Sequence, residues 1–176
     1  MKKLLLLFVP LLLIQCKQND TAIIKKNEVG GITKNTTEEQ LFKLFEDDSI
    51  VKVPEDKKYV NEYVIYTKTG EHLVTVFPMI PKDSAKIIER VQIFSPKYKT
   101  EKGISTKSTF KDVNTNYTIK KIDPTFTSAL VYIDELNATI ALDKKDLGLK
   151  ELDMNKISKD QVPDMAKIKY IDIWFN

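Results

Sequence analysis

The chain contains one histidine and one cysteine, the residue types that most often carry nucleophilic or metal chemistry. His72 lies beside Gly70 in an expected hairpin turn, and no second histidine or free cysteine completes a zinc-binding set. A serine hydrolase would also need His72, but the Gly-x-Ser-x-Gly sequence that positions its nucleophile is absent. We therefore interpret His72 as a solvated turn residue and predict no catalytic residue, no metal site and no cofactor.

Two clusters of charge could bind ions or anionic surfaces. The acidic run Glu-Asp-Asp at residues 46–48 lacks the alternating ligands and central glycine of a calcium loop, so we interpret it as the charged end of a helix. A basic stretch could contact anionic headgroups or polysaccharide; it consists of Lys97, Lys99, Lys102, Lys107 and Lys111. Glu101 and Asp112 interrupt this stretch, which favours a solvated face.

Length and net charge limit the classes of function. The 176 residues suffice for one ordinary domain or two small ones, and 42% hydrophobic with 30% charged residues is typical of a globular protein. The formal net charge is +3, and most of it comes from Lys2 and Lys3, which we expect to be removed. A nearly neutral mature chain has no general basic signal, so no nucleic-acid partner is predicted.

The first sixteen residues have the pattern of an export signal. Lys2 and Lys3 precede an unbroken apolar run at residues 4–14, which has the length of a signal-peptide core and is too short to span a bilayer. The run ends at Leu-Ile-Gln-Cys, residues 13–16, and is followed by polar residues. This segment resembles a bacterial lipoprotein signal of the Bacteroidetes type, although Gln15 stands where a small residue is usual.

The resemblance implies that residues 1–15 are removed as a signal peptide and that lipid on Cys16 attaches the protein to a membrane of the cell envelope. Several acyl chains give durable attachment where one would be marginal. The outer membrane is the preferred location, with the protein facing the periplasm or the cell surface. An uncleaved hydrophobic anchor, or an ordinary signal with an incidental cysteine, is the alternative. Residues 16–30 show no sustained apolar period, so we expect a flexible lipidated tether with a reach of about 20 Å.

The mature chain contains a tandem repeat with an offset of 72 residues. Residues 31–45 return without a gap as residues 103–117; a glycine, an isoleucine and a threonine are identical, and several other pairs are conservative. We therefore divide the folded part into two repeat units, residues 31–102 and 103–176, which we expect to pack as one domain.

Each repeat unit is expected to contain a short helix followed by three antiparallel strands. In the first unit, Thr36 with Glu39 fits a helix-capping box, and one apolar helix stripe is formed by Leu41, Leu44 and Phe45. Strand-like runs follow at residues 59–66, 73–77 and 87–94.

The second unit repeats this order. Ser108 or Thr109 is expected to cap a helix whose core stripe contains Phe110, Val113 and Tyr117. Strands are expected at residues 129–133, 138–142 and 168–174. A long connection at residues 144–164 is expected to contain a helical turn near residues 144–147 that ends at Gly148. The predicted fold class is α+β, a helix-β-β-β unit present twice, with the helices packed on one face of the sheet.

This element order, together with the Gly-Ile-Thr and Gly-Ile-Ser sequences that lead into the helices, resembles the fold of β-lactamase-inhibitory proteins and of small outer-membrane assembly lipoproteins. The resemblance covers residues 31–176. No inhibitory residue can be carried over from it, because no stretch matches a known inhibitory loop.

Strand alternation predicts a surface for a partner. Successive side chains point to opposite faces, so the core should contain Val91 and Ile93 from one unit and Ile171, Ile173 and Phe175 from the other. If the units lie side by side, the opposite side chains form a candidate binding face consisting of Arg90, Phe94, Tyr170 and Trp174. Arginine and aromatic residues are typical of interface hot spots. The alternative is that the long connection or the tether covers Phe94 and Trp174.

The preferred functional hypothesis is a lipid-anchored, non-catalytic binding module for a periplasmic or surface protein or polymer. An inhibitor of an envelope hydrolase, such as a lysozyme or a peptidase, is one alternative, and an outer-membrane assembly factor is another. Both alternatives rest on analogy of fold.

Overall fold

The computed structural model describes residues 22–54, 61–82, 85–150 and 154–175. The expected signal peptide, the lipidation of Cys16 and the first residues of the expected tether lie outside the described residues. No helix in the described part of the chain is both long enough and apolar enough to cross a membrane.

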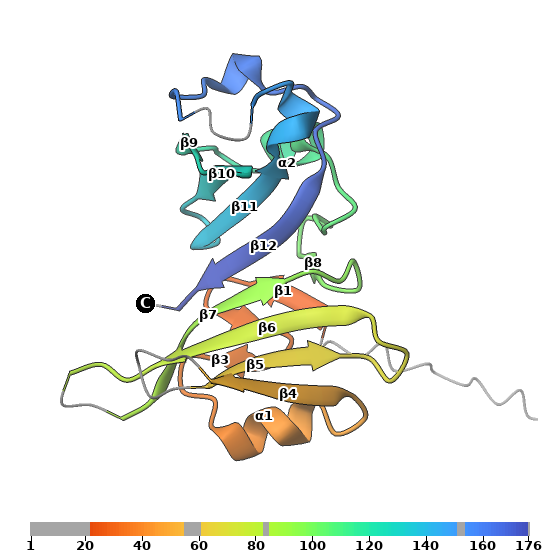
Figure 1. The fold of residues 1–176 in the computed structure, drawn as a ribbon, viewed down its shortest axis with the longest axis vertical. Helices are drawn as coiled ribbons and strands as arrows, with labels where there is room; N and C mark the ends of the chain where they lie inside the picture. Colours follow the sequence, from red (N-terminus) through yellow and green to blue (C-terminus); the bar gives the residue numbers. More distant parts are fainter. Residues whose placement is uncertain (1–21, 55–60, 83–84, 151–153, 176) are drawn as a thin grey trace, which may run out of the picture.

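An antiparallel sheet of eight strands forms the body of the protein (Figure 1). One half contains β4 (Ser49–Pro54), β5 (Asn61–Tyr66), β6 (His72–Met79) and β7 (Ile87–Ile93), and the other half contains β9 (Lys121–Pro124), β10 (Ser128–Ile133), β11 (Ala138–Asp143) and β12 (Ile168–Trp174). The halves join where β7 pairs with β12, so the strand order is β4-β5-β6-β7-β12-β11-β10-β9. β4 and β9 are therefore the two edge strands.

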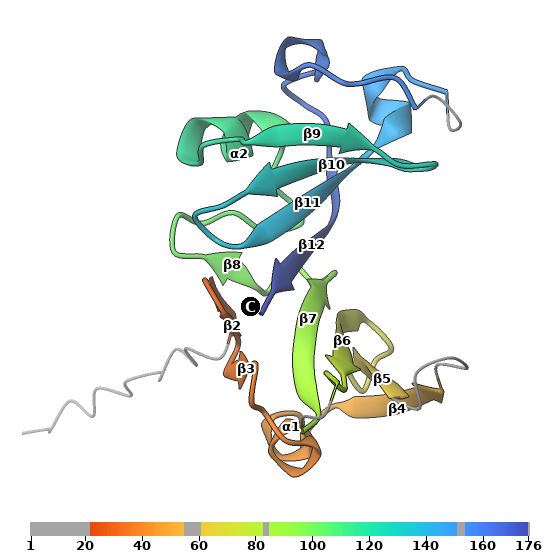
Figure 2. The ribbon, with the colours of Figure 1, turned by 90° about the vertical axis from the view of Figure 1, so that its left-hand side faces the viewer.

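A second sheet of four short strands covers one face of the large sheet (Figure 2). Its order is β3 (Ile32–Thr33), β2 (Glu28–Val29), β1 (Ile23–Lys25) and β8 (Lys99–Thr100). Ile24, Val29 and Ile32 are fully buried in the shared core. The expectation of a flexible tether is thus wrong for residues 23–29, which include the strands β1 and β2. Strands of two or three residues are too short to show an apolar period in the sequence.

The two helices begin with the same capping arrangement. α1 (Glu38–Leu44) is capped by Thr37 with Gln40, and α2 (Phe110–Asn116) is capped by Thr109 with Asp112, at the repeat offset of the sequence. The predicted box of Thr36 with Glu39 is therefore wrong by one residue. The Thr36 hydroxyl instead accepts a 2.8 Å hydrogen bond from the backbone N–H of Thr33, in the turn before the helix.

The α+β assignment is also wrong, because the protein is rich in β-structure. The described residues form twelve strands in two sheets and only two α-helices of seven residues each. Four strands of the large sheet, not three, follow each helix, since β4 and β9 were missed. All six residues of β4 are exposed or half-buried, so this strand lacks the alternation of buried and exposed positions that identifies strands in a sequence.

The core lies between the large sheet on one side and the helices with the small sheet on the other. As expected, Leu41, Phe45, Val113 and Tyr117 are buried there. Leu44 is 40% exposed, contrary to prediction. It is the last residue of α1, and its side chain lies close to Gly31. A Cβ atom added to this glycine would lie 3.2 Å from Cδ2 of Leu44.

The long connection contains two 3-10 turns, at Lys144–Leu147 and Lys159–Gln161. The first was expected at this place and ends, as expected, at Gly148, whose φ is +69°. A left-handed residue of this kind closes a helical turn most easily when it is glycine.

Candidate functional site

The face of the eight-stranded sheet opposite the helices is uncovered by any other element in the described residues, and we call it the bare face (Figures 1 and 2). Register places one residue of every strand side by side across its middle. In strand order this row is Val51, Val64, Thr75, Gln92, Asp172, Thr139, Tyr132 and Lys121. The row changes from apolar at β4 to polar at the centre, where the two halves meet.

Arg90 occupies the centre of the bare face, on β7 opposite Trp174 of β12. Its guanidinium carbon lies 3.5 Å from the ring centroid of Phe77 and 5.4 Å from that of Trp174. Nη1 of Arg90 also donates a 2.9 Å hydrogen bond to Oδ1 of Asp172. The cation is therefore held between two rings and a carboxylate, which fixes its position and joins the two halves of the sheet.

Asp172 is a buried carboxylate at the centre of the bare face, with 6% of its area exposed. Burial raises the pKa of Asp172, although Arg90 and a hydrogen bond from Gln92 act in the opposite direction. Burial also raises the pKa of the neighbouring Tyr170 hydroxyl, with a further contribution from the charge of Asp172. Arg90 thus neutralises the one buried charge at the centre of the face.

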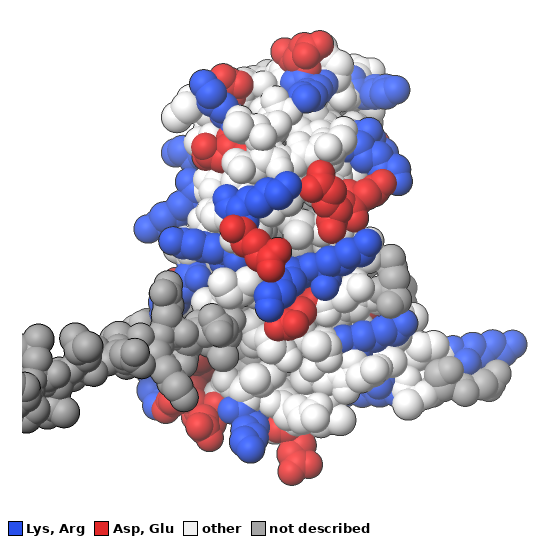
Figure 3. All heavy atoms as spheres, turned by 180° about the vertical axis from the view of Figure 1, so that it is seen from behind, with Lys and Arg blue, Asp and Glu red and all other residues white. Residues whose placement is uncertain are grey.

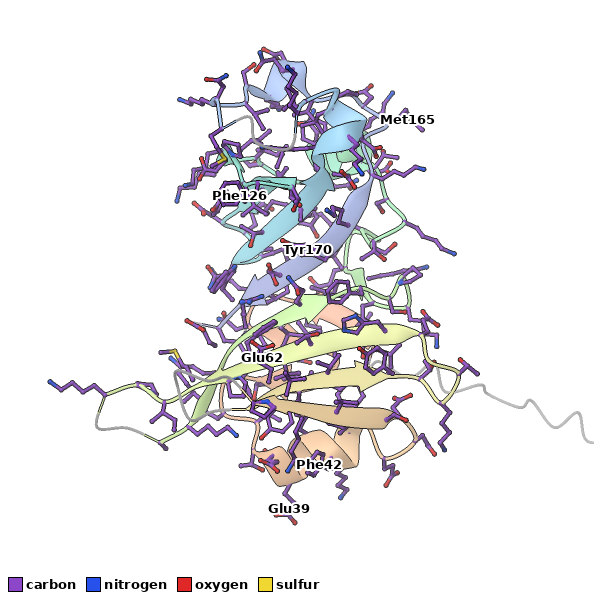
Figure 4. The ribbon with its side chains drawn as sticks, viewed as in Figure 1. Glu39, Phe42, Glu62, Phe126, Met165 and Tyr170 are labelled. Atoms are coloured by element: carbon purple, nitrogen blue, oxygen red, sulfur yellow. The ribbon has the colours of Figure 1, made fainter. Side chains whose placement is uncertain are left out.

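A row of four rings runs from β5 to β12 next to this centre. Tyr66 and His72 have ring centroids 5.0 Å apart, His72 stacks on Phe94 at 4.0 Å, and Phe94 lies 5.9 Å from Tyr170. Figure 4 shows Tyr170 on β12 on this face. The rings come from β5, β6, β12 and the residue after β7, so the row spans both halves.

His72 differs from its expected role as a solvated turn residue. It is the first residue of β6 and is half-buried, and its Nε2 atom lies 2.9 Å from the Thr75 hydroxyl. Burial lowers the pKa of His72. No group of three histidine, cysteine or acidic side chains suited to a metal occurs in the described residues. The contacts of His72 include two neighbouring rings and one hydrogen bond.

Trp174 is the most exposed member of the candidate binding face, at 37%. Its indole N–H donates a 2.9 Å hydrogen bond to the Thr139 hydroxyl, and the Asn137 side chain donates to its backbone oxygen. A pocket of about 230 Å³ opens beside it, lined in part by Tyr132 and Asn137. The described segments therefore leave part of the Trp174 side chain exposed, and the structure brings all four residues of the candidate binding face together.

The basic stretch that the sequence singled out is largely paired with acidic residues. Lys97 lies 3.7 Å from Glu71, Lys102 lies 3.1 Å from Glu135, and Lys111 lies 3.5 Å from Asp164. Figure 3 shows blue and red residues interspersed over the side of the molecule opposite the bare face. This charge distribution is that of a solvated surface, without a continuous basic patch.

Sequence reasoning missed a charged cluster beside α1. The Glu38 carboxylate accepts hydrogen bonds from Lys52 and from the Tyr63 hydroxyl, and Lys86 donates a 2.7 Å bond to the same hydroxyl. The hydrogen bond from Lys52 is the largest cause of a lowered pKa of the Glu38 carboxyl, and the hydrogen bond from Tyr63 is the second. Burial raises the pKa of the Tyr63 hydroxyl. These residues come from α1, β4, β5 and the segment before β7, and no local pattern predicts their contact. The cluster attaches α1 to the sheet.

The comparisons with known proteins establish the fold alone. No family model matches the chain. No curated protein matches it either. A solved structure with a similar fold is that of the uncharacterized protein yfeY from Escherichia coli, with a TM-score of 0.55 and 11% sequence identity, covering 87% of this chain and 99% of that chain. A likeness at this identity carries no information on function.

Proposed function

We propose that the protein is a lipid-anchored binding module of the cell envelope, and that its bare face is the docking surface for another protein. The anchor is Cys16, at the end of the lipoprotein-like signal, and the binding surface is centred on the candidate binding face. The partner is a periplasmic or surface protein, and no bond of the partner is cleaved or formed.

The observation that carries this proposal is the chemistry of the bare face. Arginine and aromatic side chains gather at its centre, and the ion pair of Arg90 with Asp172 removes most of the local charge. Charged residues are depleted from interface cores, whereas tryptophan, tyrosine and arginine are enriched there. The opposite side of the molecule carries interspersed lysines and acidic residues, which is typical of a surface that stays in water (Figure 3).

A recovery experiment with matched variants tests the proposal. The lipid-free chain of residues 17–176, which contains every described helix and strand, is immobilised and incubated with solubilised envelope proteins. Trp174→Ala removes the most exposed ring of the candidate binding face. Phe126→Ala is the control, because Phe126 is 66% exposed but lies in the turn between β9 and β10.

We expect a protein that is retained by the wild type and by Phe126→Ala but is lost with Trp174→Ala. Titration with that purified protein should show that Trp174→Ala binds it at least tenfold more weakly than the wild type does. This is a loss of binding free energy of about 1.4 kcal/mol or more, as expected for a hot-spot residue. Equal recovery by all three chains, or loss with Phe126→Ala alone, would refute the bare face as the docking surface.

A further inference from the structure

The edge strand β4 is open for pairing on its outer side. It is the terminal strand of the large sheet and pairs only with β5 among the described residues. All of its residues are exposed or half-buried, and no described strand pairs with its outer edge. The unpaired N–H and C=O groups of an edge strand can accept another strand of suitable sequence.

The side chains of β4 favour such pairing. Val51 and Val53 are 48% and 40% exposed, and they lie on the bare face beside Val64 and Glu62 of β5. The one charged residue, Lys52, points to the other face, where its ammonium group is bound to Glu38 of α1. A lysine at an edge normally discourages strand addition, but this lysine is already engaged within its own chain.

The opposite edge strand provides an internal comparison. β9 has only four residues and ends in Pro124, and its exposed Lys121 is paired with Asp123 on the bare face. Short length and charges on the exposed face are devices that block edge pairing, whereas a proline at the end of the strand is common to both edges. Of the two equivalent edges of this sheet, only β4 is apolar and six residues long.

We propose that β4 docks against β4 of a second copy of this chain. The two strands run antiparallel about a twofold axis at Val51, so that Val51 faces its symmetry mate, Ser49 faces Val53, and Ile50 faces Lys52. The three pairs place no lysine against a lysine, and they bring the exposed valines of both copies together on one face. The two bare faces become one continuous surface, which is available to a shared partner. This proposal does not depend on lipidation or on the identity of a partner.

The first test is the mass of the lipid-free chain of residues 17–176 in solution, measured by light scattering over a range of concentrations. We expect the apparent mass of the wild type to rise toward twice the monomer value. Val51→Lys should remain monomeric with an unchanged circular dichroism spectrum, because Val51 is a surface residue. Phe126→Lys, which adds the same charge away from β4, should dimerise like the wild type. A wild type that is monomeric at all concentrations, or a dimer that Val51→Lys leaves intact, would overturn the proposal.

The second test establishes the register by disulfide formation. The chain of residues 17–176 contains no native cysteine, so Val51→Cys introduces the only thiol. Directly opposed residues have Cα atoms about 4.5 to 5.5 Å apart, within the range of a disulfide. Val53→Cys is the matched control, because in this register its symmetry mate lies four residues away along the strand, about 13 Å. With copper phenanthroline and oxygen as the oxidant, we expect a covalent dimer for Val51→Cys and none for Val53→Cys; the reverse result would overturn the proposed pairing.

Discussion

Arg90 and Asp172 lie on neighbouring strands from opposite halves of the chain and are joined by a hydrogen bond of 2.9 Å between Nη1 and Oδ1. Burial raises the pKa of Asp172 even though Arg90 is adjacent. The free energy of attraction to Arg90 therefore does not fully offset the free energy of hydration that the carboxylate loses on burial. This is common for ion pairs that are removed from water.

The first prediction is strong coupling between these two residues. Arg90→Met leaves the Asp172 carboxylate buried without its cation, and we expect the free energy of unfolding to fall by roughly 2 to 4 kcal/mol. Replacing both residues, as Arg90→Met with Asp172→Leu, should cost less than the sum of the single changes. Urea denaturation of all four chains of this double-mutant cycle measures the coupling. Additive losses would show that the pair contributes no interaction of its own.

The second prediction concerns pH. The folded-state pKa of Asp172 is raised from its ordinary value of 3.8, so the folded state binds a proton more tightly than the unfolded state. Unfolding then releases protons between the two pKa values, and stability from this group falls as pH rises through that interval. The free energy of unfolding of the wild type relative to Asp172→Asn should therefore decrease from pH 3.8 upward and become constant above the folded pKa. A relative stability that increases with pH would mean that Arg90 lowers the pKa of Asp172 instead.

The third prediction contrasts two leucines of α1. Leu41 is 1% exposed and Leu44 is 40% exposed. Leu41→Ala should cost roughly 2 to 5 kcal/mol because it leaves a cavity in the core, whereas Leu44→Ala should cost less than about 1 kcal/mol, as a surface change does. Thermal unfolding of both variants gives the comparison. Equal losses would place Leu44 in the core and contradict the described helix orientation.

The fourth prediction uses Trp174, the only tryptophan, as a reporter of the bare face. Because its side chain is 37% exposed, its fluorescence in the lipid-free chain should be quenched by iodide. Addition of the docking protein should protect it. An emission that is blue-shifted and insensitive to iodide in the free chain would show that the indole is covered.

The fifth prediction concerns the anchor. Cys16→Ser removes the thiol that would carry lipid, so we expect an unprocessed precursor of higher apparent mass and no metabolic labelling with palmitate. Cell fractionation with detergent-phase partitioning measures the change in attachment. A variant that is processed, labelled and partitioned like the wild type would refute lipidation at Cys16.

The sequence predicted most accurately those features that depend on local alternation. In β7 and β12, buried isoleucine or valine alternates with polar or aromatic residues, and from this pattern we placed Val91, Ile93, Ile171 and Ile173 inward, where the structure has them. The four residues of the candidate binding face follow from the same pattern. Which strands pair could not be read from alternation, because β7 and β12 lie far apart in the sequence and their contact depends on the whole sheet.

Short elements were missed for a physical reason. Strands of two or three residues, such as β1 and β2, contain a single alternation of side chains, so no repeated pattern distinguishes them from a linker. The Glu38 cluster depends on side chains from four separate elements and has no local signature. The error in the position of the α1 cap arose because Thr36 and Thr37 are adjacent, and both can accept a hydrogen bond from a backbone N–H.

The junction of β7 with β12 also determines the expected order of folding. The residues that pair there are separated by roughly eighty positions along the chain, whereas the strands within each half are joined mostly by hairpins. Local pairings close with a smaller loss of chain entropy, so each group of hairpins should form before the junction does. Substitutions at Arg90 or Asp172 should consequently leave the folding rate nearly unchanged and act mainly by raising the unfolding rate.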